Sequence, residues 1–326
     1  MNILVTGGAG YIGSITSESL IARGHKVVVL DNLSTGHRRA IHPEAHFVQA
    51  DIAAKDVVRQ TLENYHIEAV MHFAASSLVG ESMQKPMQYF QNNSAGSLAL
   101  LEAMLASGVK KFVLSSTAAL FGRPKSLPIP SDAPIQPESV YGESKYLIER
   151  MLAWLADCAG LGFVCLRYFN AAGASEHFGE DHQPESHLIP LVLQVAQGKR
   201  ERIHIYGDNY DTPDGSCIRD YIHVQDLASA HILAIEALQP GEKRYYNLGN
   251  GQGFSVKEVI EVCRQVTGHA IPSQLSPRRS GDPAALVADA SSIQKELGWE
   301  TKFKDLESIV SSAWRWHLAH PQGYQD

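Results

Sequence analysis

Tyr141 and Lys145 are the residues of this chain whose types and spacing most clearly suggest proton chemistry. Positions four apart share one face of a helix, so a helix beginning near Tyr141 would hold the phenol and the ammonium group side by side. A free tyrosine, with a pKa of about 10, is a weak base at neutral pH, and a neighbouring positive charge favours its phenolate. Tyr-x-x-x-Lys is a loose pattern that can mark an accidental surface pair, so its meaning depends on its surroundings.

Thr117 ends the sequence Ser115-Ser116-Thr117, which closes an apolar run. Its hydroxyl could donate a hydrogen bond to an oxygen that alternates between hydroxyl and carbonyl, and so orient that oxygen for Tyr141. A cap at the end of a strand is the alternative. Successive strand side chains face opposite sides of a sheet, so we expect Thr117, rather than Ser115 or Ser116, to meet a substrate.

A glycine-rich loop follows the first apolar run, residues 3–5. It can be read as Gly8-x-Gly10-x-x-Gly13 or with Gly7 as the first glycine, and it leads into a helix-like stretch. Such a loop lets a backbone approach a pyrophosphate at a helix N-terminus. A second apolar run ends in Asp31, about 20 residues beyond the loop, as a ribose-binding carboxylate would. The pattern predicts a dinucleotide whose positive nicotinamide ring would also favour the Tyr141 phenolate, and hence redox chemistry on an alcohol.

Short apolar runs alternate with amphipathic stretches through the first half of the chain. This alternation predicts an α/β fold with a Rossmann-type doubly wound parallel sheet. After Asn170 the regular alternation of apolar and amphipathic segments gives way to polar stretches. This change predicts an NAD-binding domain at 1–172 and a smaller, mixed α/β substrate-binding domain at 173–326. We expect some segments of the second domain to pack on the first. The expected strands are 3–6, 27–30, 46–49, 69–73, 112–115 and 163–166, and the expected helices are 87–107, 188–197, 224–238, 255–267 and 306–320.

Ligands of open parallel sheets bind beyond the carboxyl ends of the strands. The residues that could do chemistry fall there. The glycine loop follows the first strand, Asp31 the second and Asp51 the third, and Ala74-Ala75, Thr117 and Asn170 follow the next three.

Composition limits the partners of the chain. Its 326 residues are 44% hydrophobic and 19% charged, with a formal net charge of −7, which argues against nucleic acid or an anionic membrane as a main partner. The four cysteines form no Cys-x-x-Cys pair, no apolar run approaches the length of a membrane span, and the N-terminus reads as a strand. We therefore expect a cytoplasmic protein with free thiols.

Further motifs extend along the whole chain. They are TGGAGYIG at 6–13, DNL at 31–33, HFAA at 72–75, VGESMQKP at 79–86, YGESK at 141–145, RYFNAAGA at 167–174, RDYIHVQDLA at 219–228, YNLGNG at 246–251, PRRSGDPA at 277–284 and HPQGY at 320–324. Through these motifs the chain resembles the extended short-chain dehydrogenase/reductases and, within them, the UDP-galactose (UDP-glucose) 4-epimerases. The resemblance implies a homodimer formed through helices near 87–107 and 143–160, and a role in galactose metabolism and the supply of UDP-sugars.

The resemblance also implies a closed redox cycle on a UDP-hexose. Tyr141 would take the proton of the sugar 4-hydroxyl while the hydride at C4 passes to tightly bound NAD⁺. The 4-keto sugar would then turn about its link to the diphosphate and receive the hydride on its other face. The catalytic residues carried over are Tyr141, Lys145 and Thr117, and Lys145 would also bind the nicotinamide ribose.

The resemblance assigns two sets of binding residues. For NAD they are Gly7, Gly10, Tyr11, Ile12, Gly13, Asp31, Asn32, Asp51, Ile52, Phe73, Ala74, Ala75, Asn92, Ser115, Tyr141, Lys145 and Phe169. For the UDP-sugar they are Thr117, Tyr141, Asn170, His187, Leu188, Tyr206, Arg219, Arg279 and Asp282. The two arginines would hold the diphosphate, for which guanidinium is suited, and an acid at position 31 would repel a 2′-phosphate, which favours NAD over NADP.

Residues that differ from those of related families limit which reaction the chain could catalyse. Sugar-nucleotide 4,6-dehydratases carry an Asp-Glu pair directly after the catalytic threonine, where this chain has Ala118-Ala119. Water elimination therefore has no evident acid. Within the epimerases, Ser77 replaces a lysine of some members and His187 an asparagine. Leu286 stands at the position thought to admit or exclude an N-acetyl group.

Two other interpretations of the chain remain open. One is a 4-epimerase of UDP-pentoses or UDP-N-acetylhexosamines, and the other is a non-catalytic protein that senses the cofactor. The retained Tyr141, Lys145 and Thr117 favour an enzyme. A loop rich in histidine and acids, 176–187, could suggest a metal site, but it lacks cysteine and a helical His-x-x-x-His spacing, so we expect no metal.

Overall fold

A seven-stranded parallel sheet forms the centre of the computed structural model, which describes residues 1–279 and 281–325. Its strand order is β10-β6-β5-β4-β1-β2-β3, and every neighbouring pair is parallel. The strands are β1 (Asn2–Thr6), β2 (Lys26–Asp31), β3 (His46–Gln49), β4 (Ala69–His72), β5 (Lys111–Thr117), β6 (Gly162–Tyr168) and β10 (Lys243–Leu248). The order reverses direction at β1 and β4, as in a Rossmann fold, so the predicted fold class is confirmed.

Helices cover both faces of this sheet. On one face α1 (Tyr11–Ala22) packs against α8 (Val224–Ala237), and on the other lie α2 (Lys55–Asn64), α5 (Gly96–Ala106) and α6 (Val140–Ala159). The inner strands β1, β2, β4, β5 and β6 are almost wholly buried, which is why their sequences read as largely apolar runs.

The seventh strand, β10, comes from the second half of the chain and was not predicted. It follows α8 and pairs with β6 at the edge of the sheet, where Tyr246 and Leu248 are buried. Its sequence, Lys-Arg-Tyr-Tyr-Asn-Leu, mixes polar and aromatic residues and is not the uniform apolar run of the inner strands, because an edge strand has a neighbour on one side only.

The helix predicted over 87–107 is present, but it is not α-helical throughout. The structure has a short helix α4 (Pro86–Tyr89), a π-helical turn η2 (Phe90–Ala95), and only then α5. Asn93 in the π turn is fully buried, and its side-chain amide donates to the Ser76 carbonyl and the Ser144 hydroxyl, each at 3.0 Å. These contacts draw the backbone toward α6, and π turns of this kind are frequent at functional sites.

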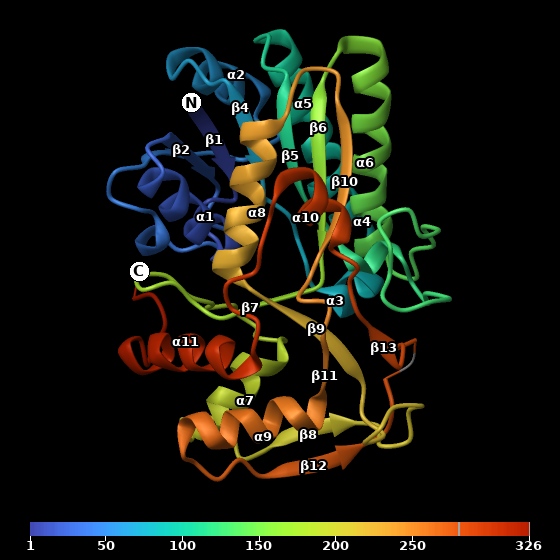
Figure 1. Ribbon diagram of the computed structural model, residues 1–326. Helices are drawn as coiled ribbons and strands as arrows, with labels where there is room; N and C mark the ends of the chain where they lie inside the picture. The colour runs from blue at the N-terminus through green and yellow to red at the C-terminus, as the bar shows by residue number, and fades with distance from the viewer. Residues whose placement is uncertain (280, 326) are drawn as a thin grey trace.

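The smaller region lies beyond the carboxyl ends of the sheet strands (Figure 1). It contains β7 (Asn170–Ala172), β8 (Ile203–Tyr206), β9 (Ile218–His223), β11 (Gly253–Ser255), β12 (Ser273–Ser276), β13 (Ala285–Leu286), α7 (Leu188–Ala196), α9 (Val256–Thr267) and α11 (Leu306–Ala319). The predicted helices α7, α8, α9 and α11 are confirmed to within one residue at each end. Helices α7, α9 and α11 share a separate apolar core that includes Val192, Val259 and Val310.

The short elements are η1 (Arg38–Ala40), α3 (Val79–Gln84), η3 (Ala118–Leu120) and α10 (Ser291–Leu297). Among the helices of the described residues, none is both long and apolar enough to cross a membrane.

Candidate active site

The glycine loop turns tightly between β1 and α1. Gly7 has a φ of +73°, and a Cβ there would lie 2.5 Å from the backbone nitrogen of Ala74. A Cβ on Gly13 would lie 2.2 Å from the carbonyl oxygen of Gly7. Only glycine fits at these two positions, and Gly10 caps α1. Tyr11, Ile12 and Gly13 thus form the first turn of a helix whose N-terminus opens beyond the sheet, which is the arrangement that binds a pyrophosphate.

Asp31 ends β2 beside this loop. Its carboxylate accepts hydrogen bonds from the backbone N–H of Ala9 at 3.0 Å and of Leu33 at 2.8 Å, and the residue is 8% exposed. Burial raises the pKa of Asp31, and the two hydrogen bonds oppose that rise. The Asn32 amide donates to the Asp51 carboxylate at 2.8 Å, so the predicted ribose and adenine residues of neighbouring strands meet. Ile52, next to Asp51, is buried.

Phe73, Ala74 and Ala75 follow β4 and lie next to the glycine loop. The backbone N–H groups of Phe73 and Ala74 donate to the Thr6 carbonyl at 2.9 and 3.1 Å. Asn92, from the π turn, donates to the Ser76 hydroxyl at 3.1 Å. The π turn therefore brings Asn92 to the carboxyl end of β4, although the two are distant in sequence.

The three predicted catalytic residues meet where β5 ends and α6 begins. Burial raises the pKa of the Tyr141 phenol, and the neighbouring Thr117 side chain opposes that rise. Lys145 is only 1% exposed, and its Nζ donates to the Ser115 carbonyl at 2.9 Å. Burial lowers the pKa of Lys145 to about 8, against the opposing effect of the Glu149 carboxylate. Ser139 caps α6 by accepting the N–H of Gly142 at 3.1 Å, which fixes where the helix starts.

A buried ion pair behind this group was not predicted. Glu149 accepts hydrogen bonds from Arg167 Nη2 at 2.6 Å, Arg167 Nε at 3.0 Å and the Ser116 hydroxyl at 2.7 Å. The two charged side chains are 2% and 4% exposed. A signal for it exists in the sequence, because Glu149 lies four residues after Lys145, on the same face of α6.

Ser115 and Phe169 occupy the neighbouring strand ends. The Ser115 hydroxyl shares a hydrogen bond with the hydroxyl of Tyr168 on β6. Phe169 packs against the apolar cluster of Ala118, Phe121 and Ile129. Both predicted cofactor residues therefore lie beside Thr117.

The predicted diphosphate and ribose residues gather in the smaller region. Arg219 on β9 forms an ion pair with Asp282 and donates to the Ile218 carbonyl at 2.7 Å. The Arg279 guanidinium lies 4.1 Å from the centre of the Tyr206 ring. The two arginines are linked, since the Asp282 N–H donates to the Arg279 carbonyl at 3.4 Å.

Three further predicted residues lie at the entrance to this region. Asn170 on β7 donates to the Asp220 carbonyl at 3.0 Å. His187 caps α7, which begins at Leu188, and its Nδ1 lies 2.7 Å from a Glu180 carboxylate oxygen. Burial lowers the pKa of His187, but the carboxylates of Glu180 and Glu185 outweigh it and raise that pKa well above its usual value. Leu286 pairs with Arg219 in the β13–β9 register and packs on the cluster beside Thr117.

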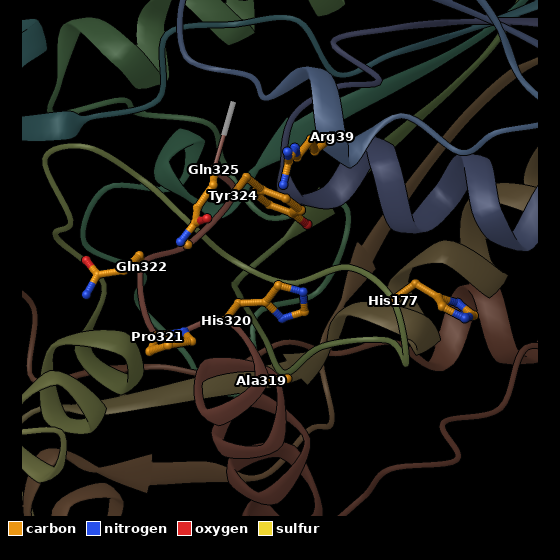
Figure 2. A pocket seen from close by; sticks show the side chains of 9 residues that line it. Arg39, His177, Ala319, His320, Pro321, Gln322, Tyr324 and Gln325 are labelled. Carbon is orange, nitrogen blue, oxygen red and sulfur yellow. The ribbon is translucent and has the colours of Figure 1, made fainter.

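A hollow in the surface lies apart from the predicted site residues. It is lined by Arg39, His177 and residues 319–325 (Figure 2). None of the predicted site residues is among the described residues that line it.

Comparisons with known proteins agree with this geometry. The model of the NAD dependent epimerase/dehydratase family matches residues 3–249. A UDP-glucose 4-epimerase of Halalkalibacterium halodurans is 56% identical, over 99% of this chain and 98% of that protein. A crystal structure of a UDP-glucose 4-epimerase superposes with a TM-score of 0.97 at 49% identity, covering 100% of both chains. That of the Bifidobacterium longum enzyme in complex with NAD⁺ and UDP gives 0.94 at 38% identity, covering 99% of this chain and 100% of that one. The chain therefore belongs to the NAD dependent epimerase/dehydratase family, within its group of UDP-glucose 4-epimerases.

Proposed function

We propose that this protein interconverts UDP-galactose and UDP-glucose by oxidising and re-reducing the sugar at C4. The observation that carries the proposal is the junction of β5 and α6, where Thr117, Tyr141 and Lys145 meet beside a loop built to approach a pyrophosphate. Together with the family, this arrangement supports an alcohol oxidation that reverses itself on a tethered sugar.

NAD is the cofactor. The glycine loop, whose Gly7 and Gly13 leave no room for a Cβ, fits its pyrophosphate, and buried Asp31 fits an unphosphorylated adenosine ribose. We assign to it the residues gathered at the carboxyl ends of the strands: Gly7, Gly10, Tyr11, Ile12, Gly13, Asp31, Asn32, Asp51, Ile52, Phe73, Ala74, Ala75, Asn92, Ser115, Tyr141, Lys145 and Phe169. When bound, NAD supplies a hydride acceptor next to Tyr141 and then returns the same hydride.

The chain's own residues accept and return the proton. Tyr141 Oη takes the proton of the sugar 4-hydroxyl, and the Thr117 hydroxyl orients that oxygen. Burial raises the pKa of Tyr141, and the Thr117 side chain opposes that rise. On this proposal the positive charges of Lys145 and of bound NAD⁺ would favour the phenolate further. After the keto sugar has turned, Tyr141 returns the proton to the same oxygen on the opposite face of the ring.

The nucleotide must be held while the sugar turns. We propose that Arg219 and Arg279 bind the diphosphate and Asp282 the uridine ribose, with Asn170, His187, Leu188 and Tyr206 completing the site. Binding would draw Arg219 from its ion pair with Asp282 toward the phosphates. On this assignment residues 1–172 hold NAD and residues 173–326 the UDP-sugar, with β10 returning to the first sheet.

The test is a substrate panel. Purified protein is expected to convert UDP-galactose to UDP-glucose without added reductant, and kcat/KM is compared with UDP-N-acetylgalactosamine and UDP-arabinose. The highest value for the UDP-hexoses supports the proposal, and turnover confined to another class would assign the site to that class. Bound NAD with no turnover of any nucleotide sugar would make the protein a cofactor sensor instead.

We also propose a homodimer formed through α4, η2 and α5, which cover the predicted segment 87–107, and through α6. These helices contact one another and carry exposed apolar side chains, of which Met87 is 76% and Trp154 67% exposed. Apolar patches of this kind mark protein interfaces. A cytoplasmic location agrees with the four free cysteines.

Charge placed on this surface is expected to separate the dimer. The variant Met87→Glu/Trp154→Glu should be monomeric by light scattering at concentrations where the unaltered protein is a dimer. Leu318→Glu is the matched control, because Leu318 is 58% exposed on α11, away from these helices. A monomer before any substitution would refute the interface.

A further inference from the structure

Four side chains that bind metals converge in the loop between β7 and α7. The donor atoms of Glu180, His182, Glu185 and His187 all lie within 4.8 Å of one another. His182 Nδ1 is 3.0 Å from Glu180 Oε1 and 3.9 Å from Glu185 Oε2. His187 Nδ1 is 2.7 Å from Glu180 Oε1 and 3.2 Å from Glu185 Oε1. Both imidazoles thus direct the same ring nitrogen toward both carboxylates.

The two carboxylates are buried. The side chains of Glu180 and Glu185 are 5% and 6% exposed, and their ion pairs are with His182 and His187. A buried carboxylate needs a compensating charge. Two protonated imidazoles could supply this positive charge. One divalent cation bound by two neutral imidazoles could also supply it, and would balance both carboxylates with a single ion.

The donor set and its spacing match zinc. Imidazole nitrogen and carboxylate oxygen bind Zn²⁺ at about 2.0–2.2 Å, which places the donors of a tetrahedral site about 3.3–3.5 Å apart. The four distances between a histidine nitrogen and a carboxylate oxygen lie on either side of this value, from 2.7 to 3.9 Å, and all the donor atoms lie within 4.8 Å of one another. Small rotations of the side chains would therefore suffice to admit the ion.

We propose that Glu180, His182, Glu185 and His187 bind one divalent transition-metal ion, with Zn²⁺ the best match. This departs from the expectation drawn from the sequence, which looked for cysteine or a helical His-x-x-x-His. The ligand pattern is Glu-x-His-x-x-Glu-x-His, and a loop rather than a helix brings it together.

The position of the cluster indicates a structural role. The His182 ring lies edge-on to Tyr11, with the ring centres 6.1 Å apart, and the Tyr11 hydroxyl donates to the Gly173 carbonyl at 2.6 Å. His187 caps α7. An ion here would fasten the loop between the start of the cofactor-binding helix α1 and the first helix of the smaller region, and its loss should lower the midpoint of thermal unfolding.

Metal content after purification without chelator, and again after dialysis against micromolar ZnCl₂, tests the proposal. We expect about one zinc per chain in the unaltered protein and in the control His177→Ala, which lies in the same loop but pairs with Glu18. His182→Ala and Glu185→Gln should lose it. No zinc in the unaltered protein, or the same zinc content in all four proteins, would overturn the site.

A second measurement does not depend on the variants folding. Chelator-treated unaltered protein should show a lower unfolding midpoint that ZnCl₂ restores, and added Co²⁺ should give the visible absorption of a tetrahedral site. An unfolding midpoint that neither the chelator nor zinc changes would contradict the structural role. Metal content is measured without turnover. The zinc measurement can therefore be interpreted even if the protein lacks the proposed epimerase activity.

Discussion

Tyr141→Phe is expected to lower kcat for UDP-galactose by about 10²–10⁴-fold, the usual contribution of a general acid–base group. The substitution removes only the phenolic oxygen, which lies beside Thr117 and which the proposed mechanism makes the acceptor of the 4-hydroxyl proton. The NAD contacts assigned to the glycine loop and Asp31 are unchanged, so the purified variant should retain its cofactor. Initial rates and the nucleotide released on denaturation measure the two effects separately.

Tyr146→Phe is the matched control, since Tyr146 lies on the same helix and outside the catalytic group. It should keep its turnover. Normal turnover by Tyr141→Phe, or equal losses in the two variants, would remove Tyr141 from the catalytic role. Loss of NAD from Tyr141→Phe alone would place the tyrosine in cofactor binding rather than in proton transfer.

Arg167→Met is expected to reduce the free energy of unfolding by about 3–5 kcal/mol, the cost of leaving one charge of a buried ion pair without its partner. Arg167 and Glu149 are almost completely buried, and the arginine also donates to the Ser131 carbonyl at 2.8 Å. Urea unfolding measures the change. Methionine keeps much of the volume of the side chain, so the effect reports on charge rather than on a cavity.

Arg150→Met provides the comparison, since Arg150 is exposed on α6 next to Glu149 in sequence, and this substitution should change stability little. The double variant Glu149→Leu/Arg167→Met should recover much of the loss, because both charges are gone. If Arg167→Met is as stable as Arg150→Met, the ion pair does not support the catalytic end of the sheet. The pair matters there because Glu149 opposes the fall in the pKa of Lys145.

The sheet was predictable because its strands obey local rules. Residues 3–5, 27–30 and 163–166 are apolar throughout, since both faces of a parallel sheet are covered by helices. The carboxyl-end rule then placed Asp31 and Thr117 at one edge without any tertiary information.

The features that the sequence did not predict depend on contacts between distant segments. The π turn at 90–95 exists because the buried Asn93 bonds to Ser76 and Ser144, and no helical pattern records that. Likewise β10 is a strand because β6 offers an edge.

For the charged groups too, the sequence shows their spacing along the chain, but their burial depends on contacts between distant segments. Glu149 sits four residues after Lys145, but its burial depends on Arg167 arriving from β6. The cluster around Glu180 lies within one loop, yet its convergence depends on how that loop folds. Sequence spacing predicted that Thr117, Tyr141 and Lys145 lie together, but it did not predict the buried groups that surround them.

The fate of the hydrogen at C4 distinguishes a closed redox cycle on one bound cofactor from exchange with solvent. UDP-galactose carrying deuterium at C4 is incubated with purified protein in ordinary water, without added NAD or reductant, and the UDP-glucose formed is examined by mass spectrometry and NMR. Retention of deuterium at C4 of the product is predicted, because the hydride leaves and returns within one bound cofactor. Replacement of that deuterium by solvent hydrogen, or accumulation of NADH and a keto sugar without UDP-glucose, would contradict the proposed mechanism.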